Sequence, residues 1–149
     1  MCIITSLPAF SQKYKRAEDT VKLNKEYVEV SNDIAELQAK LTVAQNNLPG
    51  YESRAGDANS DAQKAAENSS DQASKATNGS VKDARRAKRK AKTAYNEAKD
   101  SRSANENVSD QDDKISRLSK QLNKKQHRLS ELDSMRAEIN AKYAAPVMN

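Results

Sequence analysis

The sequence has few of the residues that fill a globular core or build a catalytic centre. Among 149 residues it contains no Trp, one Phe, five Tyr, three Gly and three Pro. Its single Cys and single His exclude an internal disulfide and a metal site made of several such ligands. No nucleophile–base set and no Gly-rich phosphate loop is present either. We therefore expect neither an enzyme nor a cofactor, and the composition leaves a long-helix protein or a disordered chain.

The first eleven residues carry no charge and resemble the end of an export signal. A short apolar run ends at Pro8, and Ala9-Phe10-Ser11 then has small residues at the −3 and −1 positions that signal peptidase requires. No basic region precedes the run, which indicates that residues 1–11 are the remnant of a longer signal. We expect cleavage after Ser11 and a periplasmic or secreted bacterial protein, or a cytoplasmic one if this segment is not a signal. The run is too short to span a bilayer, so no transmembrane segment is expected.

Hydrophobic periodicity is the main structural feature of the rest of the chain. From Leu23 onward, apolar or small residues recur in steps of four and three for more than seven heptads. This spacing predicts one long helix with a seam that needs a partner. The predicted seam positions are Leu23, Tyr27, Val30, Ile34, Leu37, Leu41, Ala44, Leu48, Tyr51, Ala55, Ala58, Ala62, Ala65, Ser69, Gln72 and Ala76.

The second half of the chain supplies a partner seam. Its predicted positions are Ala84, Ala87, Ala91, Ala94, Ala98, Val108, Ile115, Leu118, Leu122, Leu129, Leu132, Met135 and Ile139. Thr77-Asn78-Gly79-Ser80 lies between the halves, where Asn and Gly tolerate the left-handed conformation that ends a helix and Ser can cap the next one. A hairpin that turns here pairs residues whose numbers sum to about 159. Lys125 would then face Ile34 with its aliphatic stem on the seam.

These patterns predict an all-α fold, a long antiparallel two-helix coiled-coil hairpin that forms a rod over residues 12–145, with a tail at 146–149. Large side chains strengthen the base, 20–48 against 108–140, whereas the outer zone, 52–107, is rich in Ala and is expected to be loosely held. Pro49 predicts a kink or a restart of the first helix, opposite a polar stretch at 109–113 that has capping character. One continuous helix in a dimer remains an alternative, because Gly79 is tolerated within a helix.

Positive charge is concentrated just after the predicted turn. The stretch 82–92, here called the basic collar, holds seven cations and one acid. The collar cations are Lys82, Arg85, Arg86, Lys88, Arg89, Lys90 and Lys92. They form a solvated face that acids of the first arm (Asp57, Asp61, Glu67 and Asp71) partly neutralise, or they bind an anionic partner such as a lipid head group, lipopolysaccharide or an acidic protein. Nucleic acid fits less well, because Tyr95 is the one aromatic nearby for stacking bases.

A non-enzymatic structural or interaction protein fits these features best, with the hairpin as a spacer or adaptor and the collar as its docking surface. The Ala-rich seam could also open and pair with a second copy to give a homo-oligomer. The overall plan is similar in architecture to that of the periplasmic holdase chaperones with helical tentacles, which makes chaperone activity an alternative. The segment 52–107 resembles the hydrophilic repeats of late-embryogenesis-abundant proteins, which implies conditional folding. His127 is expected to be a surface histidine.

Overall fold

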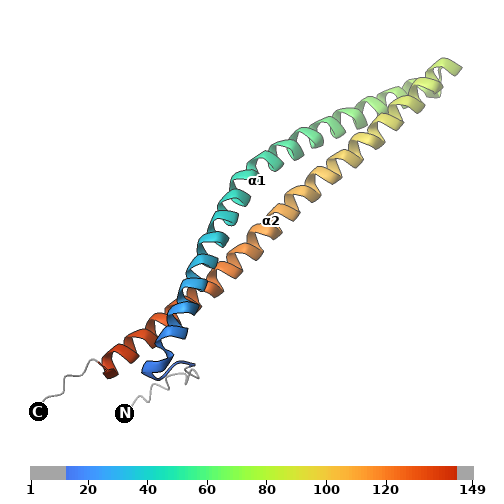
Figure 1. Ribbon diagram of the computed structural model, residues 1–149. Coiled ribbons are helices and arrows are strands. Elements are labelled where there is room, and N and C mark those ends of the chain that lie inside the picture. The colour runs from blue at the N-terminus through green and yellow to red at the C-terminus, as the bar shows by residue number, and fades with distance from the viewer. Residues whose placement is uncertain (1–12, 144–149) are drawn as a thin grey trace, which may run out of the picture. The chain divides into compact units, whose positions relative to one another are not determined.

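The computed structural model describes residues 13–143, and these form a helical hairpin (Figure 1). A short 3-10 helix, η1 (Ala17–Asp19), leads into α1 (Thr20–Thr77), and α2 (Val81–Tyr143) returns beside it. No strand occurs in the described part of the chain. The predicted all-α hairpin is therefore confirmed, and the continuous-helix alternative is wrong. The expected signal remnant at 1–11 and the tail at 146–149 lie outside the described residues.

The seam predicted along the first arm is confirmed at each of its positions. All sixteen residues from Leu23 to Ala76 are buried or half-buried, while most of their neighbours on α1 are exposed. A helix with this spacing presents a single stripe to its partner, so burial follows the heptad without a break. The stripe passes from Leu, Ile and Val at one end to Ala at the other, as the sequence requires.

The seam along α2 follows the heptad of its large residues rather than the Ala series. Val108, Ile115, Leu118, Leu122, Leu129, Leu132, Met135 and Ile139 are buried or half-buried, as predicted. Ala87 and Ala94 are half-buried, but Ala84, Ala91 and Ala98 are exposed, so these three predictions are wrong. Steps of four and three counted back from Val108 reach 104, 101, 97 and 94, and they miss 98. Ala buries too little area to pull the helix out of the register that larger side chains set.

Contacts across the hairpin give its register. The bonded pairs are Asn24 with Arg136, Asp33 with Lys125, Ala44 with Gln111, and Asn59 with Ser101. Their residue numbers sum to between 155 and 160, close to the expected 159. Lys125 is half-buried at the seam, and its Nζ lies 2.6 Å from Asp33 Oδ2, so the stem packs while the charge is paired.

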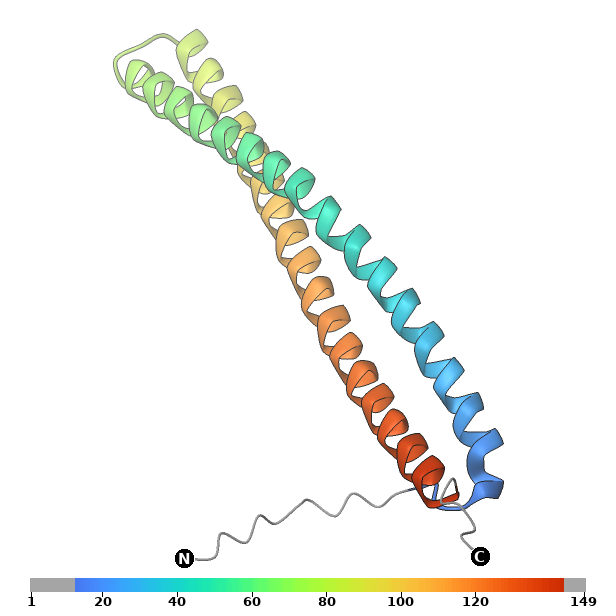
Figure 2. The ribbon, with the colours of Figure 1, turned by 90° about the vertical axis from the view of Figure 1, so that its left-hand side faces the viewer.

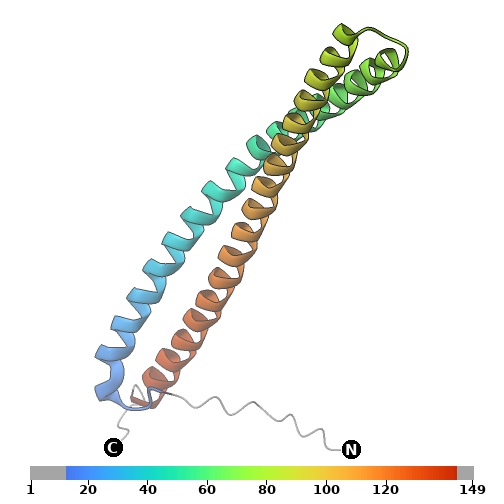
Figure 3. The ribbon, with the colours of Figure 1, turned by 90° about the vertical axis from the view of Figure 1, so that its right-hand side faces the viewer.

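The turn consists of Asn78, Gly79 and Ser80 and joins the ends of the two helices (Figures 2 and 3), while Thr77 of the predicted turn 77–80 is the last residue of α1. The expected left-handed conformation is wrong, because no described residue has a positive φ. Gly79 is needed here for space instead. A Cβ at this position would lie 2.7 Å from the carbonyl oxygen of Lys75 and 3.0 Å from the Cβ of Asp83. Any side chain would therefore push against backbone.

Ser80 and Asp83 cap the start of α2. The backbone N–H and the hydroxyl of Ser80 donate to Asp83 Oδ2 at 3.1 and 2.9 Å, while the Ser80 carbonyl accepts from the N–H of Asp83 and Ala84. These bonds hold the pKa of Asp83 below its ordinary value, with the Ser80 hydroxyl as the largest cause. A carboxylate in the first helical turn also matches the positive end of the helix dipole. Ser80 occupies the predicted capping position, but its hydroxyl donates to Asp83, and the bonds to backbone N–H groups are made by the Asp83 carboxylate and the Ser80 carbonyl.

Helix α1 continues through Pro49, and α2 continues through the polar stretch at 109–113. The expected restart of the first helix and the expected capping character of that stretch are therefore wrong, while the kink at Pro49 stays a prediction. Pro49 removes one helical amide donor, but the seam residues on both sides, Leu48 and Tyr51, remain half-buried. Packing along the seam stabilises the helix across the lost bond.

The described residues divide into two compact units, 13–38 with 120–143, and Ala39–Ser119. The first unit has a core of large side chains: Tyr14, Leu23, Val30, Leu132, Met135 and Ile139, with Tyr27, Ile34 and Leu129 packed against it. Each such residue contributes about 1.5–3 kcal/mol through burial. In the second unit the buried residues are Ala44, Ala55 and Gln111. Asn59 adds polar contacts there, since its Oδ1 accepts from Ser101 and Asn105 at 2.5 and 2.8 Å.

Candidate functional site

The basic collar occupies the first three turns of α2, directly after the Ser80 cap. All seven of its cations are exposed. The side chains of a helix radiate in all directions, and in this region only Asp83, at the turn, and Ala87 and Ala94, at the seam, are half-buried. The sequence folds in this way because Ala tolerates the seam whereas Lys and Arg must keep their charges in water. The collar is thus a solvent-facing surface of dense positive charge.

The collar cations have almost no ionic partners in the part of the chain that the structure describes. Arg86 lies 3.7 Å from Asp83, and no other collar cation forms an ion pair within residues 13–143. Of the acids expected to neutralise the collar, Asp61 pairs with Lys64 on its own helix at 3.6 Å, and Glu67 accepts a hydrogen bond from Gln63 at 3.1 Å. Direct pairing therefore leaves most of the collar charge uncompensated.

The collar presents two different faces. One is an outer stripe of residues at helical spacings of four and three: Val81, Arg85, Lys88, Lys92 and Tyr95. Its two ends are apolar or amphipathic, with Val81 73% exposed and Tyr95 71% exposed. The other face borders α1, where Arg86, Arg89, Lys90 and Thr93 line a groove together with Gln72. We call this second feature the collar groove.

A second groove adjoins the collar groove and differs in charge. Its lining residues are Asp61, Lys64, Ala65, Asn68, Lys90, Thr93 and Glu97, of which Lys90 and Thr93 belong to both grooves. Carboxylates are thus present in the second groove, whereas the lining of the collar groove has none. The collar groove is the more selective of the two for an anion.

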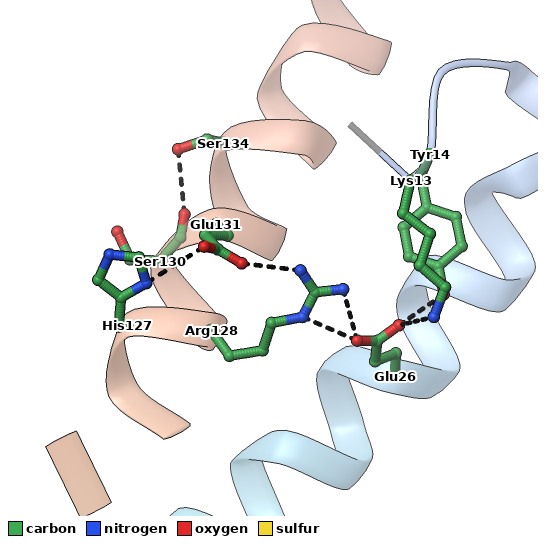
Figure 4. Close-up of polar contacts among 8 residues, drawn as sticks. All are labelled: Lys13, Tyr14, Glu26, His127, Arg128, Ser130, Glu131 and Ser134. Carbon is green, nitrogen blue, oxygen red and sulfur yellow. Dashed lines mark hydrogen bonds and ion pairs between the residues drawn. The ribbon is translucent and has the colours of Figure 1, made fainter. Parts of the chain in front are cut away.

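A polar cluster in the first compact unit centres on Glu26 (Figure 4). Glu26 Oε1 accepts from Arg128 Nε at 2.8 Å and Nη2 at 2.6 Å, and its Oε2 accepts from the Tyr14 hydroxyl at 2.5 Å and from Lys13 Nζ at 3.0 Å. The Tyr14 hydroxyl is the largest cause that lowers the pKa of Glu26 to about 2, followed by Lys13 and Arg128, while burial opposes the shift. Glu26 is fully ionised at neutral pH.

Arg128 extends this cluster along α2. Its Nη1 donates to Glu131 Oε2 at 2.7 Å, and Glu131 Oε1 lies 3.2 Å from His127 Nδ1. The hydrogen bond to Glu131 is the largest cause that raises the pKa of Arg128. His127 is exposed, as predicted. Both oxygens of Glu26 are occupied by donors, so this arrangement suits a structural clamp between the helices and the segment that precedes η1 rather than a proton-transfer group.

Sequence reasoning missed the Glu26–Arg128 pair, although a pattern for it exists. Each residue directly precedes a seam residue, Tyr27 on α1 and Leu129 on α2, and such flanking positions form interhelical ion pairs in coiled coils. No comparable pattern could have predicted the role of Tyr14, because this residue lies before the first heptad. Its burial, at 7% exposed, depends on the extended chain before η1 folding back over the helices.

Metal or membrane-spanning features do not occur in the described residues. No group of His, Cys, Asp or Glu there could hold a metal ion. Neither helix contains, within 13–143, a stretch long and apolar enough to cross a bilayer. Comparison with protein-family models, with curated proteins and with solved structures finds no match to this chain.

Proposed function

We propose that this protein is a non-enzymatic structural or interaction protein of the bacterial envelope, in which the helical hairpin acts as a spacer or adaptor and the basic collar binds an anionic partner. The observation that carries the proposal is the collar itself. Seven exposed cations lie within eleven residues, and six of them have no ionic partner in the described chain. Such a density of like charge opposes helix formation and is relieved by an anion.

The form of the hairpin supports this assignment. Two long helices are joined by a three-residue turn, and the collar lies directly beside that turn at the start of α2. Charged surface of one sign steers an opposite charge over a distance of about 10 Å at moderate ionic strength. A spacer or adaptor needs such a surface at a defined position.

Binding to anionic vesicles tests the proposal. The probe is the full chain mixed with vesicles of phosphatidylcholine that contain phosphatidylglycerol, and the matched variant carries Gln at all seven collar cations. We expect the wild type to sediment with the vesicles in a salt-dependent manner and the Gln variant to remain in solution with helical circular dichroism at least as strong as that of the wild type. Equal sedimentation of both proteins would overturn the collar as the docking surface.

Export is tested separately by the intact mass of the protein purified from its native host. A mass that begins at Gln12 supports cleavage after Ser11 and a location in the envelope. A mass that includes residues 1–11 overturns the export part of the proposal. In that case the collar would be tested against duplex DNA, where the slope of affinity against salt gives the number of phosphate contacts.

A further inference from the structure

We propose that the collar groove holds one phosphomonoester group of a membrane lipid head group. This inference rests on the proposed function, since it names the chemistry of the anionic partner. The groove is formed by four residues of α2 and one of α1, so it exists only when the hairpin is closed. Its lining residues are Gln72, Arg86, Arg89, Lys90 and Thr93.

Helical spacing brings the cations of the groove together. Arg86, Arg89, Lys90 and Thr93 lie three, four and seven residues apart, which puts them on one side of α2. Gln72 lies opposite on α1, where it is a half-buried seam residue. The two guanidinium groups and one ammonium group therefore border a common space with a carboxamide on its far wall. Lys82 lies on the same side of α2, four residues before Arg86, but it does not line the groove.

The donors of the groove are available to a ligand. Arg86 has one distant partner, Asp83 at 3.7 Å, and that carboxylate already accepts two bonds from Ser80. Arg89 and Lys90 form no ion pair within the described residues. Thr93 is different, because its hydroxyl donates to the carbonyl of Arg89 at 3.2 Å and so lines the groove without a free proton. The groove thus offers an anion two guanidinium groups, one ammonium group and the side-chain amide of Gln72.

A phosphomonoester matches this set of donors better than a phosphodiester. It carries a charge of about −1.5 to −2 near neutral pH and presents three terminal oxygens. Guanidinium groups bind such oxygens in pairs, which gives direction as well as charge complementarity. A phosphodiester has a single charge and two free oxygens, and would leave part of the positive charge unpaired.

The adjoining groove argues against a polyanionic chain. A nucleic acid strand that continued past Lys90 would meet the carboxylates of Asp61 and Glu97. The phosphates of the strand and these carboxylates carry charges of the same sign, so they would repel one another and weaken binding. A ligand with one terminal phosphate avoids these carboxylates. Duplex or single-stranded nucleic acid is therefore disfavoured at this groove.

The outer stripe indicates that the phosphate belongs to a lipid. Val81 and Tyr95 lie fourteen residues apart on the same side of α2, with Arg85, Lys88 and Lys92 between them. Tyrosine and aliphatic side chains that flank cations suit the boundary between lipid head groups and acyl chains. A freely diffusing phosphate would make no use of these two exposed side chains. The same turns of α2 thus combine an anion groove with a membrane-compatible face.

Two triple variants of equal charge test the groove. The groove variant combines Arg86→Gln, Arg89→Gln and Lys90→Gln, and the stripe variant combines Arg85→Gln, Lys88→Gln and Lys92→Gln. Both remove three exposed cations from the same turns, and Gln preserves helix propensity. Each protein is mixed with phosphatidylcholine vesicles that contain phosphatidic acid, a monoester, or phosphatidylglycerol, a diester, at matched surface charge. Circular dichroism confirms that each variant is folded.

We expect the wild type to bind the phosphatidic acid vesicles more tightly, by about tenfold or more, since several charge-assisted hydrogen bonds are at stake. The groove variant should lose this preference, and the stripe variant should keep it while binding both vesicles more weakly. Equal losses in the two variants would overturn the groove and leave the collar as a general anionic surface. Failure of the wild type to bind either vesicle would overturn the lipid assignment of the collar as well.

Competition distinguishes the source of the phosphate. Inorganic phosphate at millimolar concentration should leave the vesicle binding of the wild type largely intact, because the outer stripe also contributes. Full release of the protein by inorganic phosphate would overturn the lipid as the ligand in favour of a free phosphate compound. Preferential release by duplex DNA that depends on the groove cations would overturn it in favour of nucleic acid.

Discussion

Arg128 and Glu26 join the two helices through two hydrogen bonds to a single carboxylate oxygen, at 2.8 and 2.6 Å from Oε1. The other oxygen of Glu26 is bound by Tyr14 and Lys13, which lie before the first helix. One carboxylate thus connects α1, α2 and the segment that precedes η1. Its side chain is 21% exposed, so these bonds are partly shielded from water. The pair is a clamp at the end of the hairpin where the chain enters and leaves the helices.

The first prediction concerns Glu26→Gln. The pKa of Glu26 is about 2 in the folded protein, below its ordinary 4.5, so the folded state binds this proton more weakly than the unfolded state. The ionised carboxylate therefore stabilises the fold above pH 4.5, and this contribution is lost as the pH falls from about 5 toward 2. We expect the variant to lose about 1–3 kcal/mol of the free energy of unfolding at pH 7. Urea unfolding at a series of pH values measures it.

Glu29→Gln is the matched control for that experiment. Glu29 lies one turn further along α1 and forms an exposed pair with Lys25 at 3.9 Å. Such a pair contributes at most about 0.5 kcal/mol. In the control, the free energy of unfolding should therefore fall with pH as it does in the wild type. In Glu26→Gln it should change less over the same pH range. Parallel curves for wild type and Glu26→Gln would contradict the role given to this carboxylate.

The second prediction separates the two contributions of Tyr14. Its ring packs in the core with Leu23 and Leu132, and its hydroxyl binds Glu26 at 2.5 Å. Tyr14→Phe keeps the ring and should lower the free energy of unfolding by about 1 kcal/mol. Tyr14→Ala also empties the core position and should lower it by about 3 kcal/mol. Thermal unfolding followed by circular dichroism measures both, and equal effects would mean that the ring is not packed.

The third prediction compares the three glycines. A Cβ at Gly79 would meet the Lys75 carbonyl oxygen at 2.7 Å, but a Cβ at Gly50 or Gly56 meets nothing within 4 Å. Both of the latter lie inside α1, so Gly50→Ala and Gly56→Ala should each raise stability by about 0.5–1 kcal/mol through helix propensity. Gly79→Ala should lower it, because backbone must shift at the turn. Urea unfolding of the three single variants decides this, and a stabilising Gly79→Ala would show that the turn has room.

The fold could be predicted because its determinants are local or periodic. The turn at 78–80 consists of Asn, Gly and Ser, which are residue types typical of turns and helix ends. The heptad from Leu23 sets one register over the whole first arm. The same reasoning failed at Ala84, Ala91 and Ala98, where small residues occur on several faces of α2 and do not identify the buried one. It also failed at Gly79, which provides space between Lys75 and Asp83 rather than an unusual backbone conformation.

The two polar sites differed in how far the sequence could predict them. The collar is a contiguous run, so its charge was evident, but its division into an outer stripe and a groove depends on which side of α2 faces Gln72. The Glu26 cluster joins residues more than a hundred positions apart, and it requires the exact stagger of the helices. A seam pattern defines that stagger only to within about a turn. Long Arg and Glu side chains then select their partners.

The last prediction concerns Gln111, the buried polar residue of the second seam. It is 7% exposed, and its amide donates to the carbonyl oxygen of Ala44 at 2.5 Å. A polar side chain at a seam position favours one register at a cost in stability. The Ala44 carbonyl also has its helical partner at Leu48, so losing the side-chain bond leaves no unsatisfied acceptor. Gln111→Leu should therefore raise the free energy of unfolding by about 1 kcal/mol through added apolar burial.

Gln111→Ala is the matched variant, because it removes the same hydrogen bond without filling the space. It should lower stability, and the difference between the two variants reports how tightly the seam is packed at this position. Urea unfolding gives both values, and crosslinking across the helices, between cysteines placed at Leu41 and Leu118, checks that the register is kept. A destabilised Gln111→Leu with an intact crosslink would mean that the hydrogen bond to Ala44 contributes more than the apolar contact that replaces it.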